Sequence, residues 1–251
     1  MSAFFDYPKS AAFGRVVPKI KIYEHAGANT ALKDMFVREV DQIVWRFKLA
    51  PETTNLSATP TVAEIQVFGI SLKTGKLDEA ILRAIDKAIP FPLIFELTWR
   101  GKRKALAAFK RPSEADRDKW VISKYLATDW VPEDAPRATL PLALNMGALY
   151  ERLLEPLIAG QTARLIPAPV NGFSEAPQTP FTSAEADRPP SLEERIAQTE
   201  AIQHQTRVIE RIKAQLAREK RFNKRVAINA ELRAAVSALV TLQTSSPTEM
   251  E

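Results

Sequence analysis

The distribution of proline constrains the fold more than any other feature of the sequence. Between Leu165 and Pro190 the chain has six prolines within 26 residues, a density that neither a helix nor a sheet can maintain. From Ser191 to Leu242 it has no proline and no glycine. We therefore expect four parts: a folded domain over residues 1–160, a proline-rich linker over 161–190, a helical arm over 191–242 and a disordered tail over 243–251.

The expected helical arm begins at a clear signal. Ser191 and Glu194 have the spacing of a capping box, in which each side chain accepts a hydrogen bond from the other residue's backbone N–H. As one helix, the 52 residues of the arm would be about 78 Å long. Its stripe of apolar residues is thin, and such a helix needs a partner to be stable. The arm could dimerise like a coiled coil, turn back as a helical hairpin near Phe222-Asn223, or lie on another protein.

The first 160 residues predict an α+β fold, in which a small mixed or antiparallel sheet is combined with three helices. Apolar residues in alternating or continuous runs indicate strands, and spacings of three and four indicate helices. Arg100-Gly101 has a composition typical of a tight hairpin turn. The expected strands are Val16–Glu24, Val62–Leu72, Leu93–Trp99, Lys102–Lys110 and Trp120–Leu126, and the expected helices run from Asn29 or Thr30 to Lys48, from Asp78 to Ile89 and from Thr139 to Gly160.

The composition leaves few residues for catalysis. The chain has no cysteine, which excludes disulfides, thiolate metal sites and cysteine nucleophiles. Its two histidines, His25 and His204, are far apart and have no acidic neighbours in a metal-binding pattern. It has neither a phosphate-binding glycine loop nor a nucleophile elbow. We expect no metal, no cofactor and no catalytic residues, and binding rather than enzymatic activity.

No apolar run is long enough to span a membrane, and residues 1–10 do not have the pattern of a secretory signal. Together with the lack of cysteine, this predicts a cytoplasmic protein that does not contact membranes.

Positive charge is concentrated in the helical arm. The net charge of the whole chain is only +5, but residues 211–233 contain eight basic residues and two acidic ones. Such a segment suits an acidic protein surface or a groove of nucleic acid. Asn229 shares a helix face with Phe222 and Val226, where a polar residue can select a partner or a register. The predicted interaction helix is therefore carried by Arg218, Lys220, Arg221, Lys224, Arg225 and Asn229.

A second basic cluster lies on the expected hairpin. Aromatic and basic residues alternate there, an arrangement that can follow a phosphate backbone while a ring stacks on a base. Alternatively, the aromatic rings face the core and the basic side chains face water. The candidate nucleic-acid contacts are Trp99, Arg100, Arg103 and Lys104.

A metal-dependent nuclease is the alternative from another functional class. Glu64-Ile65-Gln66 resembles half of the PD-(D/E)xK motif, with glutamine in place of lysine and without the preceding Pro-Asp pair. Such a site would use Glu64, Gln66 and Glu96 to hold Mg²⁺. A homo-oligomeric DNA-binding protein, associating through its C-terminal helix, is a third hypothesis.

Three stretches of the sequence are similar to an uncharacterised bacterial family, catalogued as domain of unknown function 4391. They are Pro18–Glu24, Trp45–Asn55 and Glu219–Asn229. The resemblance implies an accessory subunit of a restriction-modification or phage-defence system, because members are encoded near DNA methyltransferases and helicases. The expected function is thus a non-catalytic subunit that binds a helicase or a DNA methyltransferase by protein–protein interaction, with DNA as a second partner.

Overall fold

The computed structural model describes residues 2–113, 120–165 and 190–244. The chain forms two compact units, residues 1–160 and residues 161–251. Of the expected linker, residues 166–189 lie outside the described residues, and residues 161–165 are helical as the end of α5 (Met146–Leu165). Of the expected tail, residues 245–251 lie outside the described residues, and residues 243–244 belong to α7 (Phe222–Thr244).

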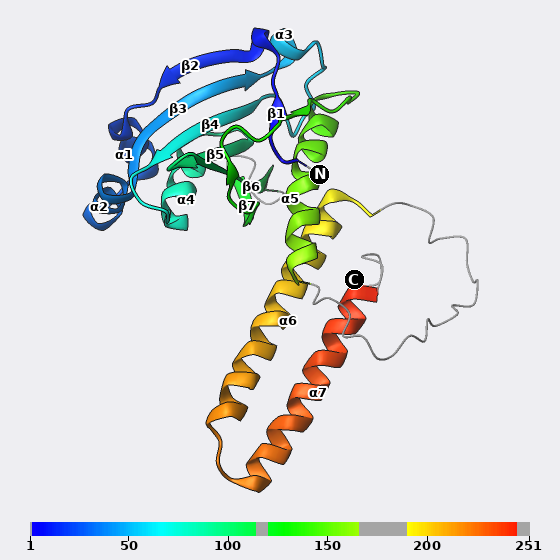
Figure 1. Cartoon of the computed structure of the whole chain (residues 1–251). Helices are drawn as coiled ribbons and strands as arrows, with labels where there is room; N and C mark the ends of the chain where they lie inside the picture. The colour runs from blue at the N-terminus through cyan, green and yellow to red at the C-terminus, as the bar shows by residue number, and fades with distance from the viewer. Residues whose placement is uncertain (1, 114–119, 166–189, 245–251) are drawn as a thin grey trace, which may run out of the picture. The chain divides into compact units, whose positions relative to one another are not determined.

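Among the described residues, the first unit contains nine strands and most of the helices (Figure 1). Its strands are β1 (Phe5–Asp6), β2 (Ala12–Val16), β3 (Val40–Leu49), β4 (Ile65–Leu72), β5 (Leu93–Trp99), β6 (Lys102–Pro112), β7 (Trp120–Ala127), β8 (Val131–Pro132) and β9 (Ala138–Thr139). Its helices are a 3₁₀ turn (Lys9–Ala11), α1 (Lys19–Ala26), α2 (Thr30–Glu39), α3 (Pro51–Thr54), α4 (Glu79–Ala88) and α5 (Met146–Leu165), the last of which ends in the second unit.

The main sheet has the strand order β2-β3-β4-β5-β6-β7, and β8 pairs with β6. Neighbouring strands are antiparallel except β4 and β5, which are parallel because α4 connects them as a crossover. A separate two-stranded parallel ladder joins β1 to β9. This mixed sheet with helices confirms the expected α+β fold.

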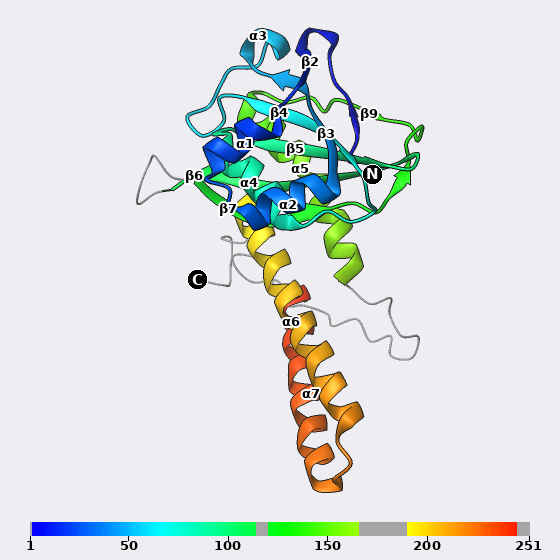
Figure 2. The ribbon, with the colours of Figure 1, turned by 90° about the vertical axis from the view of Figure 1, so that its left-hand side faces the viewer.

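Helices α1, α2 and α4 cover one face of the sheet, whereas β9 and α5 lie on the other side (Figures 1 and 2). The core beneath the three helices is formed by aliphatic and aromatic residues such as Phe36, Phe68, Ile81 and Phe95, each 0–1% exposed. We call this the helical face of the sheet and the other side the open face.

Most of the expected elements of the first unit are confirmed. The helix capped by Asp78, the β5–β6 hairpin and β7 lie where the sequence predicts them, and the strand expected at Val62–Leu72 begins at Ile65. In the hairpin turn, both Arg100 and Gly101 have positive φ angles, 47° and 69°, as a tight hairpin requires.

Two expectations near the N-terminus were wrong. Residues 19–26 form helix α1 instead of a strand, and the buried pair is Ile22 and Ala26, four residues apart, while Ile20 is 56% exposed. The helix expected up to Lys48 ends at Glu39, and β3 follows directly. The pairing of β3 with β4 shifts register between Val40 and Gln42 and again between Trp45 and Phe47. Each bulge inserts one extra residue into β3, so its apolar residues do not keep the period of two that a regular strand has. Some of them fall three or four positions apart instead, which explains why the sequence resembled a helix.

The third helix begins later and ends later than expected. Asn145 caps α5 by accepting a hydrogen bond from Ala148 N, and Thr139 lies in β9, where it pairs with Asp6. The helix continues past Gly160 to Leu165 despite Pro156 within it.

The second unit contains a helical hairpin made of α6 (Leu192–Arg218) and α7 (Phe222–Thr244). The capping box of Ser191 and Glu194 is present at the start of α6. Of the three expected arrangements of the arm, the structure has the hairpin, with its turn at residues 219–221. The two helices pack through a core of buried aliphatic residues: Ile202, Ile209, Ile212, Ile228, Ala235 and Leu239.

Candidate functional site

The tip of the hairpin, residues 218–225, carries an uncompensated positive charge. Arg218, Lys220, Arg221, Lys224 and Arg225 are all exposed, and none of them forms an ion pair within the described residues. The one acid of the tip, Glu219, accepts a hydrogen bond from the backbone N of Arg221. The structure therefore brings together the five cations that the sequence predicts for an interaction surface.

The local electrostatics at the start of α7 oppose helix stability. α7 has no acidic residue in its first turn, where Lys224 and Arg225 stand instead. The N-terminal end of a helix carries partial positive charge, so these cations are less favourable there than acids would be. Phe222, on the same turn, is 77% exposed. A bound polyanion would compensate this positive charge.

Asn229 does not lie in the core of the hairpin. It is exposed, and its neighbour Ile228 is buried against α6 instead. An outer stripe of α7 nevertheless has the spacing of a helix-pairing seam, with gaps of three and four residues. It comprises Phe222, Val226, Asn229, Arg233, Val236 and Val240, all exposed.

The four predicted contacts on the β5–β6 hairpin do not form one surface. Arg103 and Lys104 are consecutive in β6, so their side chains point to opposite faces of the sheet. Arg103 is only 4% exposed; its guanidinium donates to the carbonyl of Ala135 and lies 4.3 Å from the ring centre of Phe4. The placement of Arg103 thus disagrees with a phosphate contact, because its cation is used inside the protein.

The aromatic residue of this hairpin is also engaged internally. The ring of Trp99 packs against the core of the helical face, and its centre is 6.3 Å from that of Trp130. Arg100 is exposed in the turn, with its guanidinium 5.1 Å from the Trp99 ring centre. Only Arg100 keeps the full exposure that contact with nucleic acid needs.

The three residues of the nuclease hypothesis are divided between the two faces of the sheet. Gln66 Nε2 donates to Glu64 Oε1 at 2.5 Å, and Lys48 Nζ is 3.3 Å from Glu64 Oε2. Glu96 pairs with Gly69, which is three residues from Gln66 on β4. Side chains alternate along a strand, so Glu96 and Gln66 lie on opposite faces, with Glu96 on the open face. Within the residues described, no three His, Cys, Asp or Glu side chains are grouped as metal ligands.

Glu96 belongs instead to a buried cluster of charges on the open face, which the sequence did not predict. Its side chain is 1% exposed and is flanked across the sheet by the small residues Gly69 and Ala105. Arg137 binds it with two hydrogen bonds, Nη1 to Oε1 at 2.8 Å and Nη2 to Oε2 at 2.7 Å. This bidentate hydrogen bonding, the largest effect, raises the pKa of Arg137.

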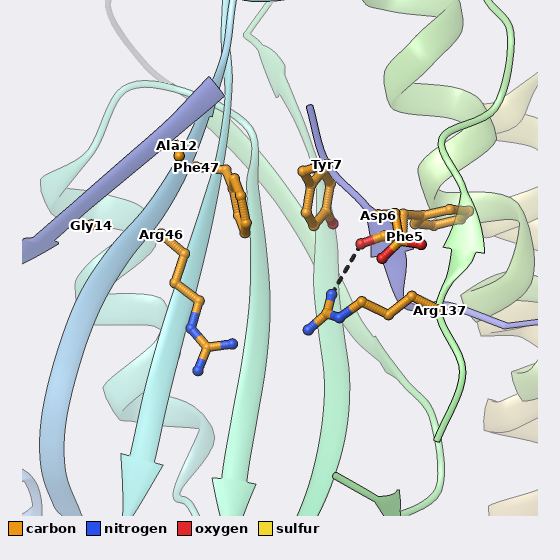
Figure 3. A pocket seen from close by; sticks show the side chains of 8 residues that line it. All are labelled: Phe5, Asp6, Tyr7, Ala12, Gly14, Arg46, Phe47 and Arg137. Atoms are coloured by element: carbon orange, nitrogen blue, oxygen red, sulfur yellow. Dashed lines mark hydrogen bonds between the residues drawn. The ribbon is translucent and has the colours of Figure 1, made fainter. Parts of the chain in front are cut away.

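Arg46, on β3, is the second cation beside Glu96. Its Nη1 lies 3.2 Å from Glu96 Oε2, and its stem passes so close to Gly69 that a Cβ there would come within 2.4 Å of Nε. Arg46 and Arg137 also line a cavity of about 430 Å³, together with Phe5, Asp6, Tyr7, Ala12, Gly14 and Phe47 (Figure 3). No motif in the sequence marks this cluster, because Arg46, Glu96 and Arg137 are separated by 50 and 41 positions.

A third group of buried polar residues lies on the helical face. Lys110 is fully buried and donates to the carbonyls of Asp86 and Ile89, and its Nζ is 3.6 Å from Asp86 Oδ1. Tyr125 donates to the same carboxylate. Burial raises the pKa of Asp86 to about 6 and lowers that of Lys110. The side chains of Lys110, Asp86 and Tyr125 provide hydrogen-bond or ion-pair partners for one another, which indicates a structural role.

Comparison with protein-family models confirms the family to which the sequence is similar. The family model described as domain of unknown function DUF4391 matches residues 5–239. The chain belongs to the DUF4391 family. Comparisons with curated proteins and with solved structures gave no match. The DUF4391 match spans both compact units, including the basic tip and the cluster around Glu96.

No helix among the described residues has both the length and the apolar content that a membrane crossing requires.

Proposed function

We propose that this DUF4391 protein is a non-catalytic accessory subunit that binds DNA through the tip of its helical hairpin. The observation that carries the proposal is the group of five exposed cations without ion-pair partners among the described residues. A phosphate backbone supplies regularly spaced negative charge to such a group and releases counterions on binding. Phe222 adds an exposed ring at the same tip, suited to stacking on an unpaired base.

The charge of the tip favours a polyanion over a single small anion. The five cations of residues 218–225 face one acid, a net charge of +4. They extend over the end of α6, the turn and the start of α7, so several phosphates can be contacted at once. The restriction or phage-defence setting, implied by the family resemblance, is the biological context that we propose for this contact.

The salt dependence of DNA binding tests this proposal. We would measure the affinity of the full chain for a labelled duplex by fluorescence anisotropy between about 50 and 200 mM salt. The triple variant R221Q/K224Q/R225Q should bind more weakly, and the slope of log K against log salt should become less steep by up to about 3. The control K9Q/K21Q/K87Q removes as much charge from exposed positions of the first unit and should keep the slope. Equal slopes in the two triple variants would contradict the proposal.

A protein partner is a second candidate, supported by the outer stripe of α7. Val226, Val236 and Val240 lie on one helix face and are 51%, 42% and 51% exposed. A partner helix could cover them, and Asn229 would then select its register. In the proposed setting, the partner is a helicase or a DNA methyltransferase.

A pull-down from the native host separates the two candidates. Tagged full-length protein would be recovered with and without nuclease treatment, and its partners identified by mass spectrometry. The outer stripe is supported as a docking surface if a helicase or methyltransferase is still recovered after nuclease treatment. The V236E/V240E variant should then fail to recover this partner. Loss of that recovery in the triple tip variant instead would assign the partner to the basic tip.

A further inference from the structure

We infer that the cavity on the open face binds a small organic monocarboxylate with a flat apolar body, recognised by Arg46. This inference is independent of the proposed DNA contact, because every residue that carries it lies in the first unit. The cavity volume of about 430 Å³ is within the range of small-molecule sites.

The bulge in β3 aims the ligand-binding residues into this cavity. The register of β3 with β4 shifts between Trp45 and Phe47, so that Arg46 is the extra residue. Consecutive residues of a regular strand would point to opposite faces, but here Arg46 and Phe47 both line the cavity (Figure 3). On the neighbouring edge strand, Ala12 and Gly14 face the same space and leave it open.

Arg46 has more unused hydrogen-bonding capacity than Arg137. Arg137 donates twice to Glu96 and once to the carbonyl of Phe5 at 3.0 Å. Arg46 has a single bond of 3.2 Å to Glu96, and its side chain is 36% exposed. A guanidinium has five N–H donors in a planar fork that matches a carboxylate. Arg46 therefore presents donors to the cavity that a ligand carboxylate can accept.

The charges around the cavity limit the ligand to a single negative charge. The two arginines are opposed by buried Glu96 and by Asp6, which is exposed and lines the cavity. A phosphate dianion would bring more negative charge than Arg46 alone can compensate next to these two carboxylates.

The walls of the cavity suit a flat apolar group. The rings of Tyr7 and Phe47 have their centres 4.7 Å apart with a tilt of 38°, and a planar ligand can pack against such a pair. The Tyr7 hydroxyl is buried without a hydrogen-bond partner in the described part of the chain. Burial is the main reason that its pKa is raised, so it stays protonated.

Titration of the full-length protein with simple probes tests the inference. Benzoate combines the carboxylate with a flat ring, benzamide keeps the shape without the charge, and acetate keeps the charge without the ring. Followed by calorimetry or by ligand-observed NMR, benzoate should bind saturably and at least tenfold more tightly than either of the other two. If benzoate does not saturate the wild-type protein, or if benzamide binds equally well, the inference is wrong.

Variants of the arginine assign the binding to this cavity. R46Q should weaken benzoate binding at least tenfold, and R46K should weaken it several-fold because an ammonium lacks the planar fork. R83Q changes an exposed arginine of α4, outside the cavity, and should leave the affinity unchanged. R46K retains a positive charge for Glu96, so it serves as the folded variant if R46Q unfolds. Unchanged benzoate affinity in a folded Arg46 variant would overturn the inference, while the salt dependence of DNA binding tests the hairpin separately.

Discussion

Tyr7 and Tyr150 are both buried, but their hydroxyl groups have different surroundings. The Tyr150 hydroxyl accepts from Lys110 N at 3.0 Å and donates to Ala108 O at 2.9 Å, where the β6–β7 ladder is interrupted by a register shift. The Tyr7 hydroxyl has no such partner among the described residues. Removing a satisfied hydroxyl leaves two backbone groups unpaired, whereas removing an unsatisfied one relieves a desolvation cost.

We therefore expect opposite effects of the same substitution at these two positions. Y7F should raise the free energy of unfolding by about 1 kcal/mol, and Y150F should lower it by about 1 to 2 kcal/mol. Urea unfolding followed by tryptophan fluorescence measures both changes. A change of the same sign in the two variants would show that the hydroxyl environments are not as described.

The buried ion pair of Lys110 and Asp86 gives a second prediction at this scale. K110A removes the cation and leaves the Asp86 carboxylate buried, which should cost about 3 to 5 kcal/mol in urea unfolding. The double variant D86N/K110M removes both charges and should be more stable than K110A. K102A, at an exposed position of the same strand, should change stability by about 0.5 kcal/mol or less. A double variant as unstable as K110A would contradict this account.

The same pair predicts how stability depends on pH. Burial raises the pKa of Asp86 from 3.8 to about 6, so between these values the folded state binds more protons than the unfolded state. The free energy of unfolding of the wild type should fall by about 2 to 3 kcal/mol from pH 4 to pH 6, relative to D86N/K110M. Thermal unfolding at pH 4, 5 and 6 tests this, and parallel pH profiles of the two proteins would refute it.

At the scale of elements, β3 shows why part of the fold could not be predicted. A strand is identified by a period of two, and β3 does not have it because of its two register shifts. Its apolar residues then fall at helical spacings, while β4, which is buried along its length, and amphipathic α4 could be identified from their patterns. For the same reason the sequence did not indicate that Arg46 and Phe47 share a face.

The first turn of α7 gives a prediction at the scale of elements. It lacks an acid, so N223D should stabilise this turn by about 0.3 to 1 kcal/mol by interacting with the helix dipole. Hydrogen exchange of the amides near Phe222–Val226 should slow up to about fivefold at low salt, read by mass spectrometry. N229D is the matched control, because it adds the same charge in the second turn and should have a smaller effect. Equal protection in the two variants would contradict the dipole account.

At the scale of the whole molecule, the division into two units has a measurable consequence. All four tryptophans, Trp45, Trp99, Trp120 and Trp130, belong to the first unit, whereas the hairpin is purely helical. I212A removes a buried side chain of the hairpin and should shift unfolding seen by circular dichroism at 222 nm, leaving the tryptophan transition in place. I81A, in the other core, should shift the tryptophan transition. Coincident shifts of both signals in I212A would mean that the units unfold as one.

The sequence predicted the candidate site only where the site is local. The five cations of the hairpin tip lie within eight residues, so their proximity follows from the chain itself. The cluster around Glu96 combines β3, β5 and a segment near β9, and only the strand order brings them together. Arg103 was predicted as a surface cation because the sequence does not indicate that the segment around Phe4 covers it.

The bulge at Arg46 also has a consequence for how the length of this chain can vary. A one-residue deletion within a regular strand reverses the facing of every residue beyond it, so such deletions are rarely tolerated. Arg46 is the surplus residue between two paired positions, and deleting it would restore regular pairing on both sides. A family member one residue shorter at this point could therefore keep the entire sheet and lose only the cation that faces the cavity.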